Sequence, residues 1–104
     1  MKIVGVSACP TGIAHTYMAQ EAIEKEARKR GWECKVETQG GMGIENELSQ
    51  EEIDEADVVL FAVAIEVEDS DRFEEKEEKG KILTAEPGEV IKNTEIIFDQ
   101  LEQL

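Results

Sequence analysis

The sequence contains little cysteine, almost no histidine and few aromatic residues. Its 104 residues include two cysteines and one histidine, which is too few for a disulfide framework or for a zinc site built from these ligands. Aromatic residues make up only 5% of the chain, so isoleucine, valine, leucine and alanine must fill most of the core. With 40% hydrophobic residues, the chain is predicted to form a single domain over residues 1–104, without a metal or a cofactor.

Positive charge and long apolar runs are also scarce. The chain carries 11 Lys and Arg against 25 Asp and Glu, a formal net charge of −14 at pH 7, which disfavours nucleic acid and anionic lipid as partners. No apolar run approaches the roughly 18 residues of a transmembrane helix, and the run that follows Lys2 is too short for a signal peptide. We therefore expect a cytoplasmic protein that does not insert directly into a membrane.

Short apolar runs alternate along the chain with helical patterns. The runs 2–8 and 57–65 predict strands buried on both faces, 33–38 predicts an amphipathic strand at a less buried, edge-like position, and 81–84 predicts a short fourth strand. This alternation predicts an α/β fold. We expect an open four-stranded parallel sheet of order 2-1-3-4 with helices on both faces, of the Rossmann or flavodoxin-like kind.

The segments between these runs carry the signals of helix starts and ends. Ser49 and Glu52 form a capping box, and Pro87 suits the first turn of a helix. The expected helices are one that ends at about Arg30, one from Ser49 to about Ala56, a short one anchored by Arg72 and Phe73 in the charged stretch 66–81, and one from Pro87 to the end of the chain.

The segment 9–16 is the best candidate for a functional site, because it joins the first buried strand to a helix. In open parallel sheets, ligands bind beyond the carboxyl ends of the strands. The free N–H groups and the dipole of a helix N-terminus attract anions there, and Gly12 permits backbone conformations that a Cβ would forbid. The predicted phosphate-binding loop consists of Pro10, Thr11, Gly12, Ile13, Ala14, His15 and Thr16.

Cys9, at the start of this loop, is the candidate nucleophile. The N–H groups that bind phosphate also favour a thiolate, and the thiolate is the reactive form of cysteine. Attack on phosphorus would give a thiophosphate ester whose oxygens the loop already binds. A cysteine at the end of a strand is often only a small buried apolar residue. We prefer that interpretation for Cys34, which lies in an amphipathic strand with no such loop.

Alternatives stay open for the residues around Cys9. His15 could contact the phosphate or tune the thiolate, or it could pack or cap in the first helical turn. Thr16 could donate its hydroxyl to phosphate or act as an ordinary cap. The segments 39–47 and 65–70 should meet at the same edge of the sheet, where the first either faces Cys9 or forms a solvated turn. The rim candidates are Gln39, Gly40, Glu45 and Asn46.

Three motifs resemble the fructose-family enzyme IIB components of the bacterial phosphoenolpyruvate-dependent sugar phosphotransferase system. They are ACPTGIAHT at 8–16, ETQGG at 37–41 and GIENEL at 43–48, with Arg72-Phe73 as a further match. The resemblance implies a fructose-like phosphotransferase. Cys9 would accept a phosphoryl group from a histidine of enzyme IIA and pass it to a sugar bound by the membrane component, enzyme IIC. It also implies docking at the inner face of the membrane through enzyme IIC.

The segment 74–80 departs from that family pattern, since it is longer and more acidic, and this leaves the partner surface and the sugar open. The loop at Cys9 also resembles that of the cysteine-dependent low-molecular-weight phosphatases. Those enzymes have an arginine where this chain has His15, and without the bidentate guanidinium hydrolysis is disfavoured. Two alternatives remain: a phosphatase-like thiol enzyme, and a non-enzymatic flavodoxin-like module that binds an anion or a nucleotide.

Overall fold

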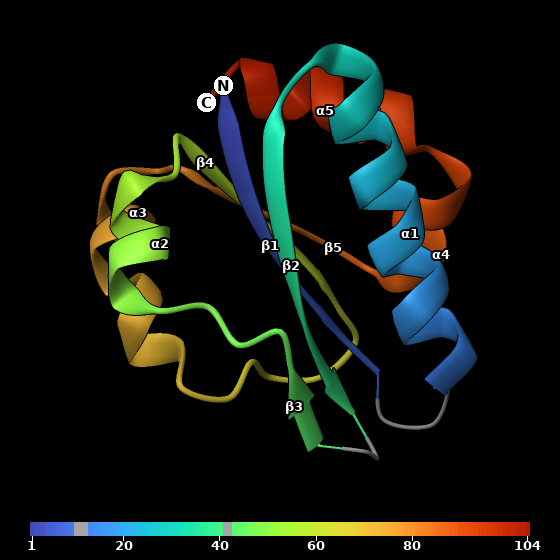
Figure 1. Ribbon diagram of the computed structural model, residues 1–104, viewed down its shortest axis with the longest axis horizontal. Helices are drawn as coiled ribbons and strands as arrows, with labels where there is room; N and C mark the ends of the chain where they lie inside the picture. Colours follow the sequence, from blue (N-terminus) through green and yellow to red (C-terminus); the bar gives the residue numbers. More distant parts are fainter. Residues whose placement is uncertain (10–12, 41–42) are drawn as a thin grey trace.

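A five-stranded sheet runs through the centre of the computed structural model, which describes residues 1–9, 13–40 and 43–104. The strand order is β3-β2-β1-β4-β5, and β1 therefore lies in the middle (Figure 1). The parallel strands are β1 (Lys2–Ala8), β2 (Glu33–Gly40), β4 (Val58–Val63) and β5 (Ile82–Ala85). The short β3 (Gly43–Glu45) pairs antiparallel with β2.

The predicted order of the four parallel strands is confirmed, but the prediction of only four strands is wrong. The segment 39–47, expected to be a loop, contains β3. Gly40 and Gly43 are paired across β2 and β3, and Gly43 has a φ of 89°, in the left-handed region that favours glycine. The short β3 therefore runs back along the end of β2. As a result β2 lies between β1 and β3 and is not the edge strand that its alternation predicted.

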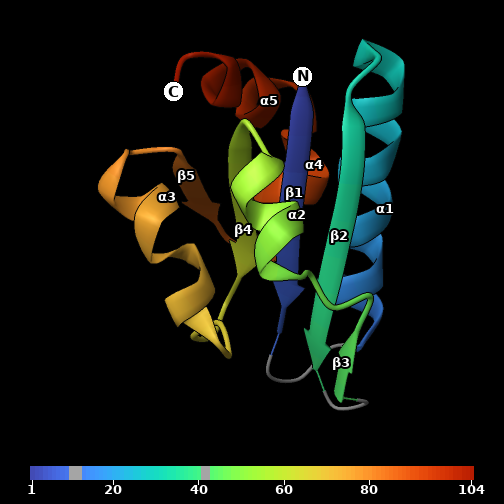
Figure 2. The same cartoon turned by 60° about the vertical axis from the view of Figure 1, so that its left-hand side comes forward.

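Helices cover both faces of the sheet, as predicted (Figures 1 and 2). The predicted capping box is present at Ser49, and Phe73 is buried at the end of the short helix that it was expected to anchor. One face carries α1 (Ile13–Arg30), α4 (Pro87–Lys92) and α5 (Thr94–Glu102). The other carries α2 (Gln50–Glu55), the 3-10 helix η1 (Ser70–Phe73) and α3 (Glu74–Glu78).

The single C-terminal helix that we expected is in fact two helices. Asn93 leaves helical geometry, with φ −123° and ψ 39°, and the hydroxyl of Thr94 donates to the carbonyl of Val90 over 2.5 Å. Such a local hydrogen bond competes with the helical backbone bonds. The apolar pattern did not reveal the break, because Val90 before it and Phe98 after it are both buried in the same cluster.

The contact between α1 and the sheet positions the candidate site. Ala19, Ile23 and Ala27 are fully buried on the inner face of α1, and Gly5 lies beneath them in β1. A Cβ at Gly5 would be 3.3 Å from the carbonyl oxygen of Leu60 and 3.8 Å from Cδ1 of Ile23. Small residues on both sides therefore bring the helix close to the sheet, which places the first turn of α1 beside the end of β1.

Candidate functional site

Cys9 lies directly beyond the carboxyl end of β1, the middle strand. The preceding residue, Ala8, is in register with Gln39 of β2 and Val63 of β4. The thiol of Cys9 is half-buried and unoxidised, and α1 begins shortly after it, at Ile13. The arrangement of buried strand, short connection and helix that the sequence predicted around Cys9 is present.

Part of the predicted phosphate-binding loop lies outside the described residues, namely Pro10, Thr11, Gly12 and the side chain of Ile13. Of the other loop residues, Ala14 and His15 are exposed and Thr16 is buried. The Ser7 hydroxyl donates to the carbonyl of Thr16 over 2.8 Å, which fixes the first turn of α1 against β1. That turn contains no acidic residue, so no carboxylate on it would repel an anion next to Cys9.

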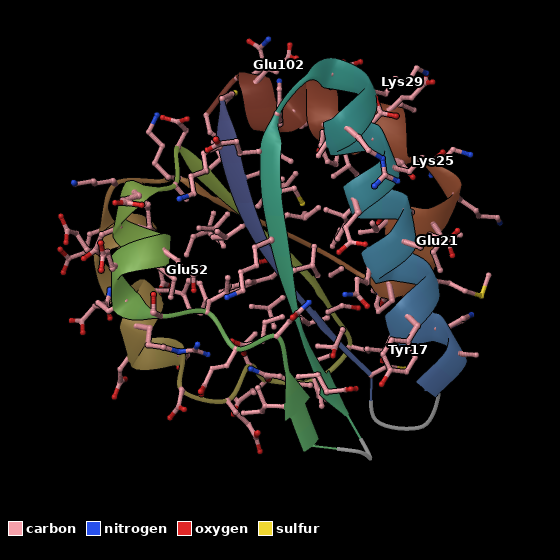
Figure 3. All side chains as sticks on the ribbon, viewed as in Figure 1. Tyr17, Glu21, Lys25, Lys29, Glu52 and Glu102 are labelled. Carbon is pink, nitrogen blue, oxygen red and sulfur yellow. The ribbon has the colours of Figure 1, made fainter. Side chains whose placement is uncertain are left out.

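A second contact joins α1 to β3 beside the site. The Tyr17 hydroxyl donates a hydrogen bond to the carboxylate of Glu45, and this bond raises the pKa of Tyr17. Tyr17 lies at the end of α1 that is on the same side of the molecule as β3 (Figure 3). The rim candidate Glu45 thus fastens β3 to α1, and the adjacent Asn46 is exposed with a left-handed φ of 57°.

A buried ion pair lies on the other side of β2. Glu37 has no exposed surface, and its carboxylate accepts two hydrogen bonds from Arg72, at 2.8 and 3.0 Å. It also accepts from the N–H of Leu48 at 2.8 Å and from the amide of Gln39 at 2.6 Å. Burial acts to raise the pKa of Glu37, but the bonds from Arg72, Leu48 and Gln39 together lower it. Glu37 is therefore an ionised, fully paired carboxylate.

Gln39 connects the end of β2 to the segment that follows β4. Its amide nitrogen donates to the carbonyl of Glu68 over 3.2 Å, and its amide oxygen accepts from the N–H of Glu68 over 2.8 Å. The N–H of Ala64 donates to the carbonyl of Ala8 over 3.0 Å. The structure therefore brings Gln39 and the segment 64–68 together beside the end of β1, with Gln39 itself 2% exposed.

The other candidate residues occupy distinct places. Gly40 is exposed and close to α1, since a Cβ on it would lie 4.0 Å from Oγ1 of Thr16. His15 lines a groove of about 560 Å³ between α1 and α4, together with Met18 and Glu89. Cys34 pairs in register with Ile3, at the opposite end of the sheet, and burial raises the pKa of its thiol to about 12.

Sequence reasoning missed the pair of Glu37 and Arg72 and the role of Tyr17. The alternation in 33–38 predicted that Glu37 faces solvent. A period of two shows which face of a strand is polar, but it does not show whether other segments cover that polar face. At the end of β2, polar loops cover the polar face. One signal could have revealed the pair: Glu37 and Arg72 belong to two of the motifs that resemble the enzyme IIB family, and they carry opposite charges.

The described residues contain neither a metal-binding cluster nor a membrane-spanning helix. Within 1–9, 13–40 and 43–104, no group of three or more His, Cys, Asp or Glu is placed to hold a metal ion. In the same part of the chain, every helix is too short or too polar to cross a bilayer.

Comparison with known proteins decides the family. The family model described as "PTS system, Lactose/Cellobiose specific IIB subunit" matches residues 4–100. The chain belongs to the enzyme IIB family of the phosphotransferase system. It is 43% identical over 101 residues to the "PTS system fructose-like EIIB component 2" of Escherichia coli K12, a match that covers 97% of this chain and 92% of that protein.

Solved structures of enzyme IIB domains have the same fold. A domain of a fructose-specific IIABC component from Borrelia burgdorferi is 48% identical, with a TM-score of 0.86 over 96% of this chain and 91% of that one. The enzyme IIB subunit of a phosphotransferase system from Escherichia coli K12 is 38% identical, with a TM-score of 0.88 over 98% of this chain and 91% of that one.

Family membership settles the class of activity. Enzyme IIB components are phosphotransferases that carry phosphoryl groups during sugar uptake, and this chain is one of them. The comparisons do not favour a phosphatase-like thiol enzyme or a flavodoxin-like binding module. The descriptions name two sugar classes, because the family model refers to lactose and cellobiose while the relatives are called fructose-like or fructose-specific.

Proposed function

We propose that Cys9 accepts a phosphoryl group from a phosphohistidine of enzyme IIA and passes it to a fructose-like sugar bound by the membrane component, enzyme IIC. One observation carries the proposal. Cys9 is a half-buried thiol directly after the middle parallel strand and just before the N-terminus of α1, where a phosphoryl group would meet helix N–H groups. Cys34 has no comparable surroundings.

The transfer consists of two displacements at phosphorus. In the first, the Cys9 thiolate attacks the phosphorus, an S–P bond forms, and the N–P bond to the IIA histidine breaks; the histidine ring, protonated beforehand on its other nitrogen, leaves as neutral imidazole. In the second, a sugar hydroxyl attacks the same phosphorus, an O–P bond forms, its proton passes to a base, and the Cys9 thiolate leaves. Both steps need mainly positioning and stabilisation of the phosphoryl oxygens.

The surroundings of Cys9 suit a carrier better than a hydrolase. Phosphatases with a similar loop have an arginine where this chain has His15. The guanidinium of that arginine stabilises the transition state of hydrolysis. Arg72, which lies beside the site, does not replace it, because its guanidinium is bonded to Glu37 and to backbone carbonyls. A phosphocysteine without this cation should persist until a partner takes the phosphoryl group.

The docking face for both partners is then the site rim, which we define as residues 9–16, 39–47 and 65–73. It exposes the apolar side chain of Ile65, which is 39% exposed, and Tyr17, directly next to the rim, is 37% exposed. It also exposes carboxylates on Glu45, Glu66 and Glu68. We infer that the protein works in the cytoplasm and reaches the inner face of the membrane through enzyme IIC.

A reconstituted relay tests this function. It contains phosphoenolpyruvate, the general phosphotransferase proteins, a matching IIA, this protein and membranes with IIC, and it is supplied with fructose or with lactose and cellobiose. Formation of fructose phosphate that depends on this protein is the expected result. A protein that gains no phosphoryl group from IIA, or that hydrolyses an aryl phosphate rapidly without partners, would contradict the proposal. Phosphorylation of the disaccharides alone would overturn the sugar assignment.

A further inference from the structure

We propose that the buried pair of Glu37 and Arg72, together with Gln39, is a positioning device that holds two loops of the site rim in the shape that enzyme IIA requires. The inference rests on the function proposed above and concerns how the protein docks. The recorded bonds of the pair run to Gln39, Leu48, Glu68 and Asp69, so its effect on transfer would pass through the segments 43–48 and 64–69.

Arg72 bonds to three separate segments at once. All five N–H donors of its guanidinium have an acceptor. Two bond to the carboxylate of Glu37, and the others to the carbonyls of Leu48 at 2.8 Å, Glu68 at 3.1 Å and Asp69 at 2.9 Å. The side chain is only 15% exposed. One residue thereby fixes the backbone of both rim loops to β2.

Each of these loops contains a non-glycine residue in a left-handed conformation. Asn46 has a φ of 57° and Asp69 a φ of 56°, and Asn and Asp are the non-glycine residues that most readily adopt this conformation. Leu48, two positions after Asn46, has its N–H bonded to Glu37 and its carbonyl to Arg72. The carbonyl of Asp69 itself accepts from Arg72. The ion pair therefore bonds to the backbone at or next to both left-handed turns.

The segment between β4 and η1 is anchored on each side of its exposed apolar residue. On one side, the N–H of Ala64 bonds to the carbonyl of Ala8. On the other, both backbone groups of Glu68 bond to the side chain of Gln39. Between these anchors Ile65 stays 39% exposed, and it directly follows Ala64, which is bonded to the residue before Cys9. This is the geometry expected of a preorganised contact with a protein partner.

Stability alone is a poor explanation for this arrangement. A buried ion pair repays its desolvation only in part, and apolar residues of similar size often stabilise a fold as well. The chain also contains a comparable arginine away from the site. Arg30 is 19% exposed and pairs with Glu26, Asp99 and Glu102, but it joins the ends of α1 and α5. Glu102 lies at the opposite end of the molecule from Tyr17 (Figure 3). Arg30 is therefore a matched control.

The test compares Arg72→Lys with Arg30→Lys in the full chain. Lysine keeps the charge but cannot bond to a carboxylate and three carbonyls together. For Arg72→Lys we expect the KM for phosphorylated IIA to rise about tenfold with kcat within about threefold of wild type, because a loosened rim costs binding and orientation. Alkylation of Cys9 by iodoacetamide should not change. The amides of Leu48 and Glu68 should exchange their hydrogens faster.

Arg30→Lys should leave the KM, the kcat, the alkylation of Cys9 and the amide exchange at the wild-type values.

Three results would overturn the inference: equal KM changes in the two variants, unchanged amide exchange in Arg72→Lys, or a loss of Cys9 alkylation that matches the loss of transfer. If Arg72→Lys does not fold, Gln39→Met replaces it. That variant removes only the bonds that the Gln39 amide makes to Glu68 and to Glu37. It should raise the KM for phosphorylated IIA and the rate of amide hydrogen exchange in residues 64–69. A wild-type protein without transfer would refute the proposed function, while amide exchange would still test the positioning of the loops.

Discussion

At the scale of single residues, the two cysteines are both free and half-buried, but they lie at opposite ends of the sheet. Cys9 directly follows the carboxyl end of β1 and precedes the N-terminus of α1. Cys34 lies at the other end of the sheet, packed against the core. Burial raises the pKa of Cys34 to about 12, so at neutral pH it is a thiol and not a nucleophile. The structure therefore makes Cys34 a poor candidate for the nucleophile, and Cys9 remains the proposed one.

Alkylation against pH measures this difference. Because only the thiolate reacts, Cys34 should stay unmodified by iodoacetamide from pH 6 to 9 and react only as the pH approaches its raised pKa of about 12. Cys9 should be at least about tenfold faster at pH 7, because burial holds Cys34 in its unreactive thiol form. Peptide mapping by mass spectrometry gives both rates, and unfolded protein, in which the two should react alike, is the control. Equal rates in the folded protein would contradict the account.

At the scale of elements, local signals predicted more than long-range ones. The strands β1 and β4, the helix α1 and the capping box at Ser49 were predictable, because an apolar run or a cap is a property of neighbouring residues. The strand β3 was not, since it depends on pairing with β2. The pair of Glu37 and Arg72 was also missed, because it joins residues far apart in the chain. Of the candidate site, the sequence therefore predicted the position of Cys9 but not the bonds that hold its rim.

The packing of α1 on β1 yields a prediction for stability. In Gly5→Ala, the added Cβ would lie 3.3 Å from a carbonyl oxygen of β4, and sheet backbone cannot move away easily. We expect the free energy of unfolding to fall by about 1–3 kcal/mol, as measured by urea denaturation. Gly88→Ala in α4 is the matched control, because a Cβ there meets no atom within 4 Å and alanine favours a helix. If the two variants are equally stable, close packing at Gly5 is not what places α1.

At the scale of the whole molecule, one end of the sheet carries the candidate site, and the other carries Cys34 and the ion pairs of Arg30. The chain has a net charge of −14, and exposed carboxylates surround the site rim. Partner surfaces that fit it should therefore be basic or apolar around their own reactive groups. Because IIA and IIC would both need access to Cys9, they would use the same rim and bind in turn.

Mapping of NMR chemical shifts tests the shared rim. Titration of the labelled protein with IIA, and separately with the cytoplasmic part of IIC, should perturb residues 9–16, 39–47 and 65–73 in both cases. An unlabelled protein of similar size and charge that is not a partner serves as the control. Perturbations confined to 86–104 would show that docking occurs elsewhere, and simultaneous binding of both partners would show that they do not share one surface.

The most direct test of the central claim is to locate the phosphoryl group and remove its acceptor. In the reconstituted relay, Cys9→Ser should abolish formation of sugar phosphate, because a serine hydroxyl is far less ionised and its phosphate ester is a poor donor. Cys34→Ser should keep most of the activity, and His15→Gln should slow transfer without moving the phosphoryl group. Intact mass and peptide mapping should place that group on Cys9. Turnover by Cys9→Ser, or a phosphoryl group on His15 or Cys34, would contradict the mechanism.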